Sequence, residues 1–324
     1  MTQTNPLITI ILPLWDRSEY SVTWIENNLF DDFNYIIADG SRQEKNHQIF
    51  KCISQRSNIN YIRFPADTDT NYFKKKMLHA VSEVNTPYVM TCDNDDFLVL
   101  KGILSCVDFL SKNDRYGFCN GGIRSILEVE KQAHKSDKKY QLRYGKLETT
   151  NLNNKENFSA ISGLFRPYKN VWYAVYRTNI YEKIWGEIVQ SDVDNIFLIE
   201  YLQSQLAFCL SHGWALGETH YLRLGNPTSS SAKDLTPDQY PSRHGIYFDD
   251  NYRAQVLTSG KVLAKLLAID EQKIYDEYRY FYGHPFQGYQ LRDIYFNKII
   301  NYFYSILMPA LGISNVRSLV RVLD

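Results

Sequence analysis

The stretch TPYVMTCDNDDF, at residues 86–97, decides the fold that we predict for this chain. The short apolar run at 88–92 is followed at once by three acids, Asp93, Asp95 and Asp96. Such a run, bounded by turn-forming residues, is typical of a buried strand. Carboxylates this close repel one another unless a cation lies between them, and their oxygens suit Mg²⁺ or Mn²⁺. On these residues alone, a divalent-metal site and a solvated acidic turn are equally good interpretations.

Composition narrows the class of protein. The chain has 324 residues, 44% of them hydrophobic, which suits one large α/β domain with an appendage, or two domains. Lys plus Arg and Asp plus Glu number 36 each, so the formal net charge is zero. A dedicated nucleic-acid-binding protein would usually show a basic excess, so we expect no nucleic-acid partner.

The cysteines indicate the compartment. There are 5, widely scattered, with no CxxC pair and no Cys/His cluster, which disfavours structural zinc and a disulfide framework. This usage fits a reducing cytoplasm. We see no signal-peptide pattern at the N-terminus and no run of about 18 apolar residues. The sequence therefore predicts a cytoplasmic protein with no membrane-spanning segment.

The first hundred residues alternate strands and helices. Strands are predicted at 7–14, 35–39, 61–64 and 88–92, and helices at 20–30, 44–55 and 72–84. This order predicts right-handed crossovers and a mostly parallel sheet with helices on both sides. Asp16 and Arg17 follow the first strand, and Asp39 ends the second. Because ligands bind at the carboxyl ends of such strands, we expect these groups and the acid cluster to share one site.

The second half of the chain is less regular. We predict a helix at 98–110, strands at 116–119 and 171–177, a polar excursion at 128–157 and a helix at 192–210. Glu200 lies beside the apolar face of that last helix, where partial desolvation would raise its pKa and let it accept a proton. A surface glutamate at the edge of an amphipathic helix is the alternative interpretation.

The C-terminal region has a different composition. Residues 251–324 are predicted to be helical, after a hydroxyl-rich loop that includes 228–231. The segment 290–323 is aromatic and apolar with scattered positive charges. Such a segment can lie on a membrane surface, dock on the main domain or form a dimer interface, and the sequence leaves these three open.

Three segments resemble a known family. Residues 9–17 (TIILPLWDR) resemble the opening strand of inverting family 2 glycosyltransferases with the GT-A fold. Residues 37–41 (IADGS) are similar to the end of their second strand, and 85–97 to their metal-binding DxD segment. YFKKK at 72–76 and WYAVYRT at 172–178 are closest to a bacterial subgroup. The resemblance covers roughly residues 7–230.

The resemblance implies roles for individual residues. Asp39 would hydrogen-bond the base, usually uracil. The implied nucleotide-binding residues are Pro13, Leu14, Trp15, Arg17, Asp39, Lys76, Asp93 and Asn94. The implied metal ligands are Asp93, Asp95 and Asp96, for Mn²⁺ or Mg²⁺. The implied catalytic base is Glu200, with Asp192 second and Asp194 third, because the spacing to Gly213 fits Glu200 best.

The implied activity is that of a metal-dependent inverting hexosyltransferase. It would move a sugar from a nucleoside-diphosphate donor, expected to be a UDP-sugar, to a glycan or lipid-linked acceptor in bacterial surface polysaccharide synthesis. Residues 1–231 would form the GT-A domain, with a nucleotide-binding half at 1–97 and an acceptor half at 98–231. Residues 232–324 would form a helical region, able to contact the inner face of the cell membrane or to dimerise.

Two other functions compete with this one. A sugar-phosphate nucleotidyltransferase also places a metal-binding acid on a parallel sheet, but it normally has a Gly-rich loop after the first strand. The corresponding residues here, WDRSE at 15–19, contain no glycine. A non-catalytic nucleotide-sugar-binding subunit is the other alternative, and retention of all three aspartates counts against it.

Overall fold

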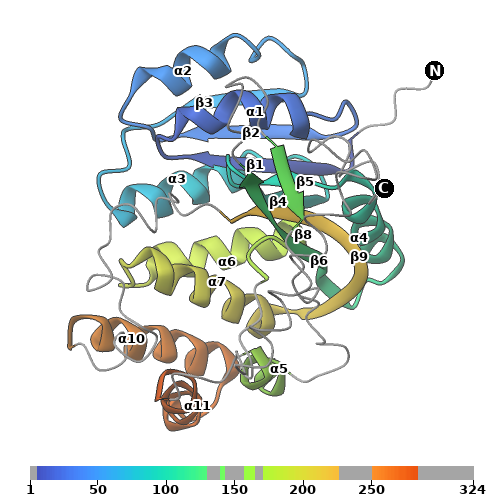
Figure 1. The fold of residues 1–324 in the computed structure, drawn as a ribbon. Helices are drawn as coiled ribbons and strands as arrows, with labels where there is room; N and C mark the ends of the chain where they lie inside the picture. The colour runs from blue at the N-terminus through green and yellow to red at the C-terminus, as the bar shows by residue number, and fades with distance from the viewer. Residues whose placement is uncertain (1–5, 130–138, 143–156, 165–170, 226–249, 284–324) are drawn as a thin grey trace.

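The computed structural model describes residues 6–129, 139–142, 157–164, 171–225 and 250–283 (Figure 1). The strands are β1 Ile8–Leu14, β2 Asn34–Asp39, β3 Ile59–Arg63, β4 Tyr88–Thr91, β5 Phe97–Leu98, β6 Tyr116–Val129, β7 Lys139–Leu142, β8 Val175–Arg177 and β9 His212–Leu224. The helices are α1 Ser18–Asn28, α2 Glu44–Lys51, α3 Thr70–Ser82, α4 Leu100–Lys112, α5 Asn157–Leu164, α6 Thr178–Gln190, α7 Ile196–Leu210, α10 Asp250–Leu267 and α11 Glu271–Gly283.

The N-terminal part is a parallel sheet. Strand β1 pairs in parallel with β2 on one side and β4 on the other, and β2 pairs with β3. Nearly every residue of β1, β2 and β4 is buried, as expected for parallel strands that are covered on both faces. The predicted fold class, an α/β fold with a central sheet flanked by helices, is confirmed. It is also the class that the GT-A resemblance implies.

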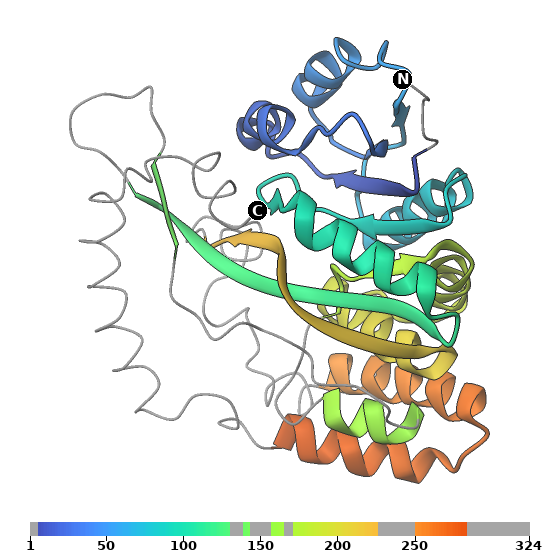
Figure 2. The same ribbon diagram turned by 90° about the vertical axis from the view of Figure 1, so that its right-hand side faces the viewer.

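The sheet continues through strands from the second half of the chain, in the order β3-β2-β1-β4-β8-β6-β9-β5. Strand β8 is antiparallel to both β4 and β6, whereas β6 and β9 run in parallel. Figure 2 shows β6 and β9 as two long curved strands lying side by side. Because β9 also pairs with β5, its carboxyl end returns to the loop that carries the acid cluster.

Helix α7 is central to the packing of the second half of the chain. Residues 202–209 are all buried, so this part of the helix is covered on every side. Helix α10 holds its start, because Gln255 Oε1 accepts from the backbone N–H groups of Asp194 and Asn195, each at 3.1 Å. Helix α11 also contacts it, since the Tyr278 hydroxyl donates to Gln205 Oε1 at 3.2 Å. The described C-terminal helices therefore pack on the predicted GT-A domain, and the domain boundary at 231/232 stays a prediction.

Several elements differ from those predicted. Strand β6 runs well beyond its predicted end at residue 119, because its residues up to Ile126 pair with β9 and those from Ile126 to Val129 pair with β7. This pairing overrides the chain-breaking character of Gly121 and Gly122. Only Val175–Arg177 of the predicted strand at 171–177 is in the sheet. The predicted helix at 192–210 begins at Ile196, where Asn195 Oδ1 caps Leu198 N at 3.2 Å. Helix α6 was not predicted.

Other predictions lie outside the described residues, including the hydroxyl-rich loop at 228–231, most of the excursion at 128–157 and the segment at 290–323. Among the helices that are described, none has the length and apolar character needed to cross a bilayer.

Candidate active site

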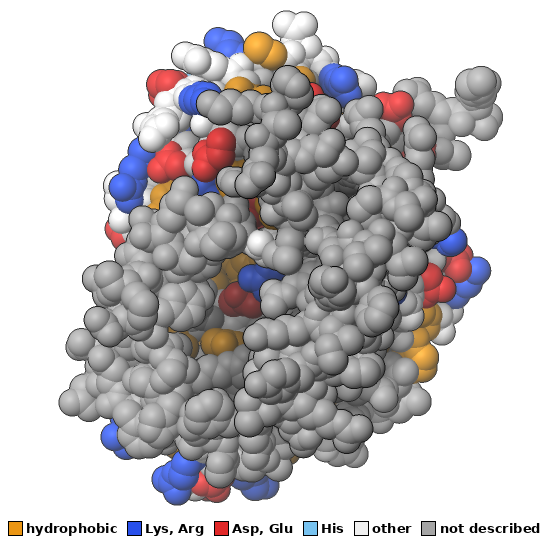
Figure 3. All heavy atoms as spheres, viewed as in Figure 1, with side chains coloured by type: hydrophobic (Ala, Val, Ile, Leu, Met, Phe, Trp, Pro, Cys, Tyr) orange, Lys and Arg blue, Asp and Glu red, His pale blue; other side chains and the backbone are white. Residues whose placement is uncertain are grey.

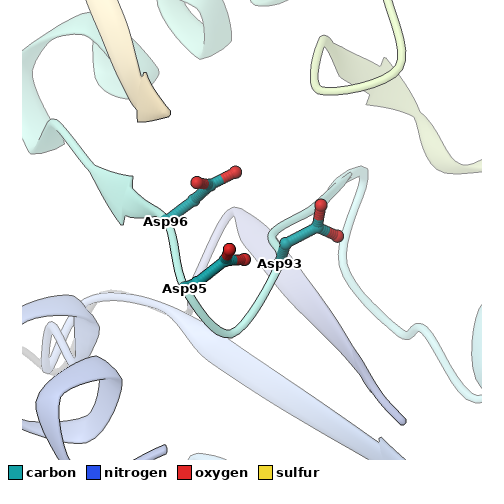
Figure 4. A group of neighbouring side chains, drawn as sticks. All are labelled: Asp93, Asp95 and Asp96. Carbon is teal, nitrogen blue, oxygen red and sulfur yellow. The ribbon is translucent and has the colours of Figure 1, made fainter. Parts of the chain in front are cut away.

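Three carboxylates meet on the loop after β4. Asp93, Asp95 and Asp96 each present an oxygen within 4.8 Å of the others. Figure 4 shows the three side chains on one tight turn between β4 and β5. The side chain of Asn28, at the end of α1, holds this turn in place. Its Nδ2 donates to the Asp96 carbonyl at 2.9 Å, and its Oδ1 accepts from Leu98 N at 2.7 Å. The predicted acid cluster is therefore a defined group and not a loose solvated turn.

Two tyrosines from distant segments hold two of these acids. The Tyr173 hydroxyl donates to Asp93 Oδ2 at 2.6 Å. The Tyr221 hydroxyl donates to Asp96 Oδ2 at 2.8 Å, and its oxygen accepts from Asp93 N at 3.1 Å. Asp96 Oδ1 also accepts from Leu224 N at 2.7 Å. Both oxygens of Asp96 thus have donors from β9, which gives this acid a role in joining β9 to the loop.

Arg17 holds the remaining acid. Its Nη2 donates to Asp95 Oδ2 at 2.7 Å, and its carbonyl accepts from Asn94 Nδ2 at 3.0 Å. Asp16 and Arg17 both have left-handed backbone conformations, with φ of 53° and 55°. Each costs a non-glycine residue roughly 1–3 kcal/mol. The strain is offset by hydrogen bonds, among them Asp16 Oδ1 accepting from Arg42 N at 2.9 Å.

Burial and mutual repulsion act on the acids. Burial raises the pKa of the Asp93 and Asp96 carboxyls, and the nearby charge of Asp95 raises both further. A divalent cation beside them would offset that repulsion, and an all-oxygen donor set is what Mg²⁺ and Mn²⁺ prefer. Asp93 and Asp95 each keep an oxygen that is not engaged by Tyr173 or Arg17. The residues present therefore fit a divalent metal.

Asp39 lies at the end of β2, directly across from Leu14 of β1. It is fully buried, and its carboxylate has three partners. Oδ2 accepts from the Tyr61 hydroxyl at 2.6 Å and pairs with Arg63 Nη1 at 2.9 Å, while Oδ1 accepts from Ser41 N at 2.8 Å. The predicted base-binding residue is thus a buried, well-neutralised anion at the carboxyl edge of the sheet.

Lys76 is also deeply buried, with a side chain 1% exposed. Its ammonium forms an ion pair with Asp67 and donates to the Leu14 carbonyl at 2.9 Å. Gly40 makes this arrangement possible, because a Cβ there would lie 2.5 Å from the Asp67 carboxylate. Lys76 therefore ties β1 to the segment after β3.

The other predicted residues of this edge differ in exposure. Pro13 is half-buried and Leu14 is buried, within β1. Trp15, the next residue, is 43% exposed, which is unusual for so large an apolar side chain. The predicted nucleotide-binding residues thus include one exposed aromatic side chain, directly after β1.

Glu200 lies in the first turn and a half of α7 and is half-buried. Its charge acts on Tyr173 and on Arg223, the same two residues that the charges of Asp93 and Asp96 affect. Glu200 is therefore within electrostatic reach of two residues that the acid cluster also affects. Asp192 and Asp194 are exposed residues between α6 and α7, and their charges act on Lys74 of α3.

His220 is fully buried. Its two ring nitrogens face the backbone carbonyls of Tyr173, at 2.9 Å, and Gly122, at 3.2 Å. This geometry ties β9 to β6 and to the segment before β8, which is a structural role.

Sequence reasoning missed several residues of the site, namely Tyr173, Tyr221, Arg223, Asp67 and Asn28. Tyr173 lies in the aromatic segment at 171–177, which we expected only to form a strand. The available signal for Tyr221 and Arg223 was their alternation along β9, which places them on one face. Figure 3 shows that the face viewed there is hollowed near its centre, where both acidic and basic side chains are visible.

No family model matches this chain. No curated protein matches it either. Among solved structures, S. aureus TarS 1–349 is similar at 12% identity over 88% of this chain and 92% of its own, with a TM-score of 0.49. The same protein in complex with UDP-GlcNAc is similar at 12% identity over 82% of this chain and 74% of its own, with a TM-score of 0.48.

A third similar structure is the mannosyltransferase PcManGT from Pyrobaculum calidifontis, in complex with GDP-Man and Mn²⁺. It is 9% identical over 99% of this chain and 86% of its own, with a TM-score of 0.48. At these identities and TM-scores, the donor, the metal and the mechanism have to be argued from the chain's own residues.

Proposed function

We propose that this chain is a metal-dependent inverting glycosyltransferase of the family 2, GT-A type. It moves a hexosyl group from a nucleoside-diphosphate sugar, with UDP the expected nucleotide, to a hydroxyl of a glycan or lipid-linked acceptor. The observation that carries the proposal is the cluster of Asp93, Asp95 and Asp96, whose oxygens lie within 4.8 Å of one another at the carboxyl end of a parallel strand.

The order of the strands supports a nucleotide site in the N-terminal part of the sheet. In register, Asp39 of β2 lies across from Leu14, and Thr91, two residues before Asp93, lies across from Ile11. The ends of β2, β1 and β4 therefore form one edge, and the exposed Trp15 directly follows β1. This arrangement supports a nucleotide at the β1 and β2 ends with its diphosphate directed at β4.

Asp93 and Asp95 would hold the metal, and Asp96 would hold the loop to β9. A bound metal ion would neutralise charge on the diphosphate. Arg17 keeps Asp95 in place through a bond of 2.7 Å, and Tyr173 keeps Asp93 in place through one of 2.6 Å. Both acids are thus oriented before any ligand arrives.

Glu200 would act as the base. Its carboxylate takes the proton of the acceptor hydroxyl while that oxygen bonds to the anomeric carbon. The bond from that carbon to the diphosphate breaks, and the electron pair leaves with the diphosphate. One displacement inverts the anomeric centre, and a positioned base of this kind contributes roughly 10²–10⁴-fold in rate.

The resemblance supports bacterial surface polysaccharide as the product class, with residues 1–97 binding the nucleotide and 98–231 the acceptor. These assignments rest on likeness to a family, and the fold alone does not carry them.

The test is a panel of UDP-, GDP- and CMP-sugars incubated with the protein and Mn²⁺, with release of nucleotide measured by chromatography. We expect slow hydrolysis of one donor, lost with EDTA and in Asp93→Asn and Asp95→Asn. Asp108→Asn, an exposed acid of α4, is the matched control and should behave as wild type. Release that persists in the Asp93 and Asp95 variants would contradict the proposal.

A thermal-shift screen separates the alternatives. Stabilisation by a nucleoside triphosphate alone, with release of pyrophosphate from a sugar phosphate and that triphosphate, would replace our proposal with a nucleotidyltransferase. No stabilisation by any nucleotide, with or without Mn²⁺, would instead favour a structural role.

A further inference from the structure

Arg223, near the carboxyl end of β9, has no part in the function proposed so far. Side chains alternate along a strand, so Arg223 lies on the same face of β9 as Tyr221, two residues before it. That face is the one turned to the acid cluster, because the Tyr221 hydroxyl donates to Asp96 and accepts from Asp93 N. Tyr221 is fully buried, whereas Arg223 is exposed.

The backbone of Arg223 is held firmly on both sides. Leu222 pairs with Phe97 of β5, the residue directly after Asp96. Leu224 N donates to Asp96 Oδ1 at 2.7 Å. On the other edge of β9, Arg223 pairs in register with Ser125 of β6. The strand therefore fixes where the side chain starts.

Several charged and phenolic groups act on the Arg223 guanidinium. The pKa of its guanidinium is raised, first by the Tyr173 phenol and then by the carboxylates of Asp96, Glu200 and Asp93. Arg223 is thus a cation on which the charges of both the proposed metal ligands and the proposed base act. Arg17, the other arginine whose charge acts on Asp93, is 16% exposed and bonded to Asp95.

We propose that Arg223 binds the diphosphate of the donor, next to the metal ligands. This deepens the proposed function and rests on it. A guanidinium presents five N–H donors in a planar fork that matches two phosphate oxygens, so it is suited to this group. Arg223 is exposed and charged at every pH of interest, whereas Arg17 is committed to Asp95. When the sugar is transferred, Arg223 stabilises the negative charge that develops on the departing nucleoside diphosphate.

The experiment compares Arg223→Gln and Arg223→Lys with wild type by calorimetric titration of three probes in Mn²⁺: UDP, UMP and uridine, with GDP, GMP and guanosine run in parallel. Arg115→Gln is the matched control, since Arg115 is exposed at the opposite end of the β6/β9 pair, where Tyr116 faces His212. A charge-assisted pair of bonds to phosphate corresponds to roughly 10–100-fold in affinity.

We expect the affinity of Arg223→Gln to fall by that factor for the nucleoside diphosphate, to fall less for the monophosphate and to be unchanged for the nucleoside. Arg223→Lys should recover part of it. Mn²⁺ alone should bind Arg223→Gln as well as wild type or more tightly, because a neighbouring positive charge has been removed. Arg115→Gln should match wild type throughout.

Two results would overturn the inference while leaving the proposed function intact. One is wild-type diphosphate affinity in Arg223→Gln. The other is an equal loss for Mn²⁺ alone and for the nucleoside, which would mean that Arg223 supports the loop. If wild type itself binds no nucleoside diphosphate in Mn²⁺, the proposed function fails, and this inference fails with it.

Discussion

Tyr173 and Tyr221 lie face to face, with ring centroids 4.1 Å apart and ring planes 18° from parallel. They come from separate segments, one before β8 and the other in β9, yet each hydroxyl donates to a different acid of one cluster. The stacked phenols therefore hold two acids of the cluster together. The acid cluster is thus organised by side chains far from it in the sequence.

This relationship predicts that Tyr173→Phe weakens metal binding. Asp93 loses the donor that stabilises its charged form, and a hydrogen bond to a charged group is worth about 1.5–3 kcal/mol. We expect Mn²⁺ affinity at neutral pH to fall by roughly tenfold, measured by calorimetric titration. Tyr72→Phe, a change at an exposed tyrosine of α3, is the control. Unchanged Mn²⁺ affinity in Tyr173→Phe would exclude Asp93 as a ligand.

The assignment of the base predicts the behaviour of Glu200→Gln. Because the amide cannot accept the acceptor's proton, we expect glycosyl transfer to fall by about 10² or more while UDP affinity in Mn²⁺ stays within about twofold. Glu182→Gln, an exposed acid of α6, serves as the control. Should Asp192→Asn abolish transfer while Glu200→Gln retains it, the base would be Asp192.

The Lys76–Asp67 pair predicts a non-additive loss of stability. Burial lowers the pKa of Lys76 and raises that of Asp67, and each charge opposes the shift of the other. Lys76→Met leaves a buried carboxylate unpaired, so we expect the free energy of unfolding to fall by about 3–5 kcal/mol in urea titration. The double variant with Asp67→Asn should recover much of this loss.

The same double variant tests Lys76 as a nucleotide-binding residue. If it folds stably and binds UDP like wild type, Lys76 acts through the fold. A stable double variant with weakened UDP affinity would instead support the direct contact that the resemblance implies.

His220 predicts a pH dependence of stability. Burial lowers its pKa below the usual value near 6.5, although the carbonyls of Tyr173 and Gly122 oppose the shift. The unfolded chain takes up a proton below about pH 6.5 before the folded chain does, so stability is full above that pH and declines below it. We expect Tm without metal to fall between pH 7 and 5.5, and to fall less in His220→Gln. Identical slopes in both proteins would show that other groups cause the decline.

The local pattern predicted the first half of the chain well. In a buried strand such as β1, nearly every residue is apolar, so the strand can be recognised from the sequence alone. Polar residues directly after such strands indicate the edge of the sheet where ligands bind. The local pattern failed for the start of α7, which lies at Ile196 and not at residue 192, and for β6, which pairs with β9 well beyond the predicted end at residue 119. Both depend on partners more than ninety residues away or on helices from the C-terminal region.

The sequence by itself determined that acids follow a buried strand, and that Asp39 and Arg17 belong to the same edge, because parallel strands end together. Only the tertiary structure decided what each acid touches. The Tyr173 hydroxyl donates to Asp93, and Arg17 donates to Asp95. Both carboxylate oxygens of Asp96 accept from donors of β9. The tertiary structure also placed Glu200 and the acids within electrostatic reach of Arg223. The physical reason is that charge and burial of a carboxylate are settled by neighbours across the sheet, which a linear pattern does not contain.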